Sequence, residues 1–73
     1  MDLNATRQPI SEARANITDV IASVRLLRRA VFLTRRDKPL VALVPVELGE
    51  LVEQAGGPDK AAAILAAHLA GDQ

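Results

Sequence analysis

The sequence contains no cysteine, one histidine and one aromatic residue, and each shortage excludes a class of function. Without cysteine the chain has neither disulfides nor thiol chemistry. His68 alone cannot supply the several histidine and cysteine ligands of a usual zinc site. Phe32 alone cannot form the series of aromatic rings on which single-stranded nucleic acid stacks. We therefore expect no metal and no cofactor.

Catalytic signatures are also missing. Gly56 and Gly57 are followed by Pro58, and not by the Lys-Ser/Thr pair that completes a phosphate-binding loop. His68 fits a surface residue near the end of a helix better than a general base. We expect that this protein is not an enzyme.

Long apolar runs are absent from the 73 residues. None approaches the roughly 20 residues that span a bilayer, and the first nine residues, MDLNATRQP, lack the basic and then apolar order of a signal peptide. We expect no membrane contact and a cytoplasmic location. A single domain of this length buries only roughly 60% of the surface of its unfolded chain, so its own core is marginal.

The net charge of zero hides a division between the two parts of the chain. Residues 1–45 carry eight cations and four anions, a net charge of +4, whereas residues 46–73 carry one cation and five anions, a net charge of −4. Either the division is solvated surface that arose by chance, or the two parts meet different partners, one acidic and one basic. The cations of the first part are Arg7, Arg14, Arg25, Arg28, Arg29, Arg35, Arg36 and Lys38.

Apolar spacing predicts an α+β fold. An N-terminal strand within residues 2–8 precedes Pro9, and a single amphipathic helix, with Ser11 as N-cap, runs from there to about Leu27. A β-hairpin follows, with strands Val31–Arg35 and Leu40–Val44. Two C-terminal helices complete the chain, at 46–55 with Leu48, Leu51 and Val52 turned inward, and after the Gly56-Gly57 stop.

The second hairpin strand indicates a homodimer. Residues 40–44, Leu-Val-Ala-Leu-Val, are apolar at every position, which is typical of a strand covered on both faces. The chain has too little material to cover the second face, so a second copy is the simplest cover.

Basic residues gather at the tip of the predicted hairpin, where Arg35, Arg36 and Lys38 follow one another closely. On one continuous helix, Arg14, Thr18, Arg25 and Arg29 would share a flank. Charges at the tip could act only against aggregation of strand edges, but that role does not account for the basic helix flank. Arginine suits phosphate and the guanine edge, and basic patches repeated by a two-fold axis match a palindromic duplex.

Two stretches, ISEARANITDVI (residues 10–21) and VFLTRRDKPLVALVPVE (residues 31–47), resemble the Phd/YefM family of type II antitoxins. The helix motif is present as Ser11, Glu12, Ala13, Arg14, Asn16 and Ile17, and the hairpin motif as Thr34, Arg35, Arg36 and Pro39. Asp37 departs from the pattern, because many members have Gly or Asn there.

The resemblance implies an antitoxin that neutralises a toxin, commonly a ribonuclease, and represses its own operon as a homodimer on operator DNA. Residues 1–55 would form the dimerisation and DNA-binding domain, and residues 56–73 the toxin-binding tail. Two other functions stay open, a solitary DNA-binding regulator and a protein-interaction module without DNA binding. The predicted DNA-binding residues are Arg14, Arg35, Arg36, Lys38 and Arg25, and the predicted toxin-binding residues are Leu51, Ile64, Leu65 and Leu69.

Overall fold

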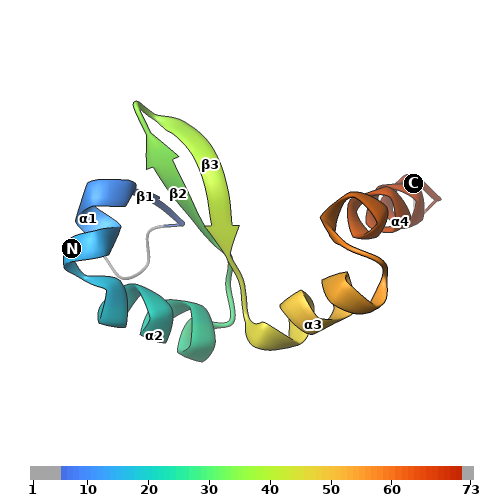
Figure 1. Ribbon diagram of the computed structural model, residues 1–73, viewed down its shortest axis with the longest axis horizontal. Coiled ribbons are helices and arrows are strands. Elements are labelled where there is room, and N and C mark those ends of the chain that lie inside the picture. Colours follow the sequence, from blue (N-terminus) through green and yellow to red (C-terminus); the bar gives the residue numbers. More distant parts are fainter. Residues whose placement is uncertain (1–5, 72–73) are drawn as a thin grey trace.

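The computed structural model describes residues 6–71, which form a small α+β fold with a three-stranded mixed sheet and four helices (Figure 1). This confirms the predicted α+β class and the order of strand, helical segment, hairpin and C-terminal helices. The elements are β1 (Arg7–Pro9), α1 (Ile10–Ala15), α2 (Ile17–Leu27), β2 (Val31–Arg35), β3 (Lys38–Leu43), α3 (Val46–Gln54) and α4 (Pro58–Gly71).

The sheet has the order β1-β2-β3, with β1 parallel and β3 antiparallel to the central strand β2. The register between β2 and β3 pairs Phe32 with Ala42 and then shifts at a bulge, so that Thr34 pairs with Pro39. Pro39 therefore lies inside β3, which begins at Lys38, two residues before the start that the sequence predicted. A proline is tolerated there because β3 is an edge strand.

The single helix predicted up to Leu27 is wrong, because the chain breaks at Asn16 into α1 and α2. Asn16 has φ −128° and ψ 35°, and its side-chain Nδ2 donates to the carbonyl oxygen of Glu12 at 3.1 Å. An asparagine amide competes in this way with the helical backbone. The predicted N-cap is also wrong, since Ser11 is the second residue of α1 and Pro9 occupies the cap position.

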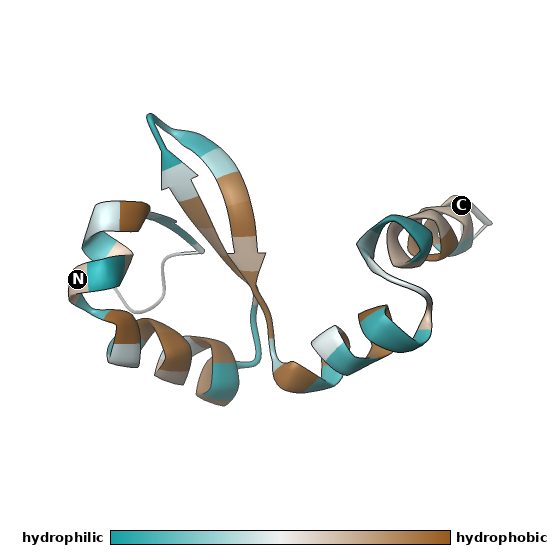
Figure 2. Cartoon of the chain, viewed as in Figure 1, coloured by the Kyte–Doolittle hydropathy of each residue, from teal (hydrophilic) through white to brown (hydrophobic). Residues whose placement is uncertain are grey.

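The core lies between the sheet and the two helices α1 and α2, which cover one face of the sheet (Figure 1). The opposite face is uncovered, and Phe32 on it is 41% exposed. Figure 2 shows hydrophobic residues along both α2 and β3. The buried apolar cluster contains Ala13, Val20, Val24 and Val31.

Helices α3 and α4 form a separate pair beyond the sheet and cross each other steeply (Figure 1). Gly56 and Gly57 join them with φ of 102° and 110°, a conformation that residues with a Cβ rarely adopt. Leu48, Leu51 and Val52, which were predicted to turn inward, line a groove between α3 and α4, but none of the three is buried, and Leu48 and Leu51 are 40% and 59% exposed. Of the helices within residues 6–71, none is both long and apolar enough to cross a membrane.

Candidate nucleic-acid interface

Three arginines from two distant parts of the chain meet at one cavity of about 270 Å³. Arg14 comes from α1, Arg35 ends β2, and Arg36 begins the hairpin turn. We call these three residues the basic cluster. None of the described residues that line the cavity is acidic, so the cationic field there is not neutralised from within.

Arg36 lies in the hairpin turn with a left-handed backbone conformation, which is uncommon for residues that have a Cβ. Arg35 and Lys38 are paired, and the two residues between them, Arg36 and Asp37, have φ of 52° and 66°. Two successive left-handed residues match the turn that fits the twist of a tight hairpin, for which Asn-Gly is the usual sequence. The chain keeps a cation at the tip despite the strain of this conformation.

Two hydroxyl groups also line the cavity. Ser11 lies on α1 beside Arg14 in sequence, and Thr34 on β2 is only 7% exposed. Hydroxyl and guanidinium groups are both common phosphate partners. Sequence reasoning assigned Ser11 to helix capping and so missed this placement. Thr34 was recognised only as part of the hairpin motif.

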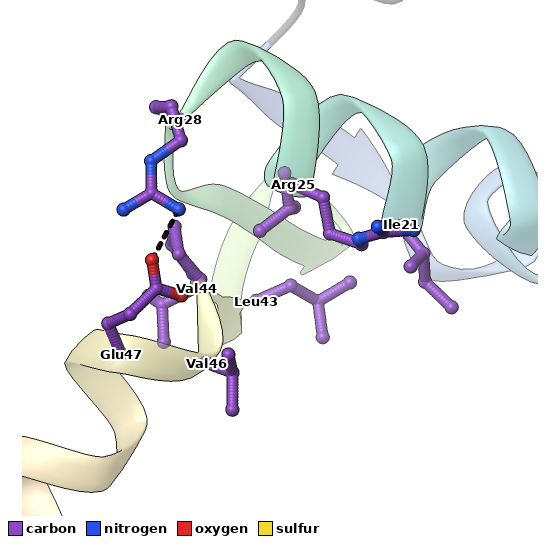
Figure 3. A pocket seen from close by; sticks show the side chains of 9 residues that line it. Ile21, Arg25, Arg28, Leu43, Val44, Val46 and Glu47 are labelled. Atoms are coloured by element: carbon purple, nitrogen blue, oxygen red, sulfur yellow. Dashed lines mark ion pairs between the residues drawn. The ribbon is translucent and has the colours of Figure 1, made fainter.

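The structure separates the other two predicted DNA-binding residues from the cavity. Lys38 opposes Arg35 across the hairpin and so shares the tip without lining the cavity. Arg25 lies elsewhere, on a groove of about 600 Å³ between α2 and the start of α3 (Figure 3). Arg14 and Arg25 belong to different helices, α1 and α2, on either side of the break at Asn16.

An ion pair lies among the residues that line that groove, as Figure 3 shows. Arg28 Nη1 lies 2.7 Å from Glu47 Oε2, joining the end of α2 to the first turn of α3. The hydrogen bond from its own backbone N–H, followed by the bond from Arg28, holds the pKa of Glu47 below its ordinary value. Arg28 is thus engaged at the joint between α2 and α3, which no pattern in the sequence indicated.

The predicted toxin-binding residues gather on helices α3 and α4. Leu51, Ile64 and Leu65 line one apolar groove of about 160 Å³ between the two helices, and each is more than half exposed. Leu69 lies farther along α4, outside the groove lining, and is 64% exposed.

Within residues 6–71, no group of three His, Cys, Asp or Glu side chains is arranged to hold a metal ion. Comparison with protein-family models, with curated proteins and with solved structures finds no match for this chain. The function is therefore argued from the residues themselves and from their arrangement.

Proposed function

We propose that this protein is the antitoxin of a type II toxin–antitoxin system. It binds operator DNA as a homodimer through the basic cluster, represses its own operon, and neutralises a partner toxin through helices α3 and α4. The observation that carries the proposal is the meeting of Arg14, Arg35 and Arg36 at one cavity. The resemblance of residues 10–21 and 31–47 to Phd/YefM antitoxins supplies the biological setting.

The chemistry of the cavity favours a polyanion with closely spaced charges. Duplex DNA carries one negative charge for about every 1.7 Å of its axis, and each lysine or arginine that neutralises a phosphate releases condensed counterions. Arginine binds phosphate with two parallel hydrogen bonds, and it can also read guanine in the major groove. Arg35 and Arg36 are exposed at the protruding tip of the β2–β3 hairpin, from which their side chains can reach into a groove of the duplex (Figure 1).

The second part of the proposal is supported by the surface of α3 and α4. Glu50 and Glu53 are exposed on α3, and the net charge after residue 45 is −4. A ribonuclease toxin carries basic residues to hold its RNA substrate, so an acidic surface beside an apolar groove suits it.

One observation favours the solitary regulator as a second candidate. The α3–α4 groove is lined by leucine, valine, isoleucine and alanine, without the aromatic side chains that dominate many tight interfaces. In that case the basic cluster has the same role, and helices α3 and α4 bind another partner or none.

The test of DNA binding is fluorescence anisotropy with the duplex upstream of the protein's own start codon, against a scrambled duplex. We expect tighter binding to the native duplex, and Arg35→Ala should weaken it by about 1–3 kcal/mol, or roughly 5- to 150-fold. Arg25→Ala is the matched control, since it removes the same charge from the other groove. If the two variants lose the same amount of DNA affinity, or if neither loses any, the basic cluster is not the DNA-binding site.

The test of toxin binding is co-expression with the product of the neighbouring gene. A chain that lacks residues 58–73 should lose neutralisation of a toxic product and keep its affinity for DNA. If the truncated chain neutralises fully, the α3–α4 groove is not the toxin site.

A further inference from the structure

Two apolar residues line the same cavity as the basic cluster. Pro9 ends β1 and Ile10 begins α1, and we call these two residues the apolar wall. The parallel register pairs Pro9 with Thr34, so the junction of β1 and α1 lies beside the end of β2, where Arg35 follows. The cavity therefore combines cationic, hydroxyl and apolar side chains.

The fold does not use the side chain of Ile10 as part of its core. Among residues 6–71, the partly buried hydrophobic side chains that pack on the buried apolar cluster are those of Leu33 and Leu43, and Ile10 is not one of them. Ile10 is half-buried, and Pro9 is exposed. Both residues therefore present apolar surface to a ligand that occupies the cavity.

A phosphate group does not account for the apolar wall. Phosphate oxygens are bound by cations, hydroxyls and N–H groups, and they gain nothing from an isoleucine or a proline beside them. In the major groove the base edges carry polar atoms, and thymine alone adds an apolar group, its C5-methyl. Arginine reads guanine there, and apolar side chains contact the thymine methyl. The mixed chemistry of the cavity thus fits the edges of bases.

We infer that the apolar wall contacts the C5-methyl group of a thymine that neighbours a guanine read by the basic cluster. Successive bases of a strand are about 3.4 Å apart along the axis, so one cavity reaches neighbouring base pairs. Ile10 then distinguishes thymine from cytosine, which has a hydrogen atom in place of the methyl group. The inference rests on the proposed DNA binding and adds which bases the site selects.

Deoxyuridine tests the inference with the unaltered protein, because it lacks the C5-methyl group of thymidine and keeps its hydrogen-bonding atoms. Fluorescence anisotropy is measured on the upstream duplex with each thymine replaced by uracil in turn. Burial of one methyl group corresponds to about four-fold in affinity. We expect a loss of about that size at one thymine beside a guanine in each half-site, and about 15-fold when both are replaced.

Ile10→Ala shows whether Ile10 makes the contact. This variant should bind the native duplex more weakly than the unaltered protein does, and it should bind the native and uracil duplexes equally, because the contact is missing from both. Ile10→Val keeps a branched side chain at the start of α1 and should respond to uracil to an intermediate extent; it replaces Ile10→Ala if that variant does not fold.

Ile21→Ala is the matched control. It is the same substitution at an exposed isoleucine on α2, which lines the other groove. This variant should keep the full response to uracil. The comparison also separates a methyl contact from any effect of uracil on the flexibility of the duplex, since such an effect is the same for every variant.

Three results would overturn the inference. Equal affinity for the thymine and uracil duplexes at every position would exclude a methyl contact and leave DNA binding intact. A loss that persists undiminished in Ile10→Ala and Ile10→Val would mean that Ile10 does not make the contact. Equal binding of the unaltered protein to the upstream and scrambled duplexes would contradict the proposed function itself, and the inference with it.

Discussion

Replacing Asp37 by glycine should stabilise the protein and strengthen its binding to DNA. Asp37 adopts φ of 66° in the hairpin turn. A left-handed conformation costs a residue with a Cβ roughly 1–2 kcal/mol, and costs glycine nothing in steric terms. Asparagine and aspartate tolerate this region better than most residues, so we expect Asp37→Gly to raise the free energy of unfolding by about 1 kcal/mol. The variant also removes the carboxylate nearest in sequence to the basic cluster.

The assay is urea denaturation monitored by far-UV circular dichroism. Intrinsic fluorescence does not serve, because the chain has no tryptophan or tyrosine. With a slope of about 1 kcal/mol per molar urea for a chain this small, the midpoint should rise by about 1 M. All variants are compared at one protein concentration, since the stability of a dimer depends on it. Anisotropy on the upstream duplex should show tighter binding by Asp37→Gly at the same salt concentration.

Arg36→Asn is the matched control at the other left-handed position of the turn. Asparagine accepts this conformation, so the fold should be kept while the cation is removed. DNA affinity should fall, and the slope of log K against log salt should decrease by about 0.9 for each phosphate that the variant no longer neutralises. A lower urea midpoint for Asp37→Gly would refute the assigned turn, and an unchanged salt slope for Arg36→Asn would refute the role of Arg36 in binding phosphate.

Three further predictions concern other parts of the chain. Gln8 is 2% exposed, and its side-chain amide has no hydrogen-bond partner among residues 6–71. Gln8→Met should therefore stabilise the fold by about 1–2 kcal/mol, and a lower urea midpoint would contradict this. The pKa of Glu47 is lowered in the folded state, so its carboxylate stabilises the fold above its unfolded pKa, and this stabilisation is lost as the pH falls through the folded pKa. Glu47→Gln should therefore lower the urea midpoint at pH 7 but not at pH 2. Equal effects at both pH values would count against the ion pair. Ile64→Asp should abolish toxin neutralisation in co-expression without changing the affinity for DNA, and retained neutralisation would exclude the α3–α4 groove.

Apolar spacing predicted the helical segments, and two short apolar runs rich in β-branched residues, on either side of Asp37 and Pro39, predicted the hairpin. It could not predict the break at Asn16, since apolar residues continue at intervals of three and four across it, from Ala13 to Ile17 and Val20. The break is a local effect of the asparagine side chain on the backbone. It places Arg14 and Arg25 on different helices.

The candidate site was predicted only in part, for a reason of tertiary structure. The motifs pointed to Arg14 and Arg35, but the order of residues along the chain does not show that they line one cavity. The ion pair of Arg28 with Glu47 likewise joins residues that are distant in sequence. The exposure of Leu51 could not be predicted either, because an amphipathic helix has the same spacing whether its apolar face meets its own chain or a partner.

The most direct test of the central claim is the salt dependence of operator binding by the unaltered protein and by the variant with Arg14, Arg35 and Arg36 all changed to glutamine. The account predicts that log K for the unaltered dimer falls linearly with log salt, and that the slope is reduced by about 5 in the variant, or about 0.9 for each of the six arginines of two copies. If both proteins show the same slope of log K against log salt and the same affinity, the basic cluster does not bind DNA. That result would contradict the proposed function.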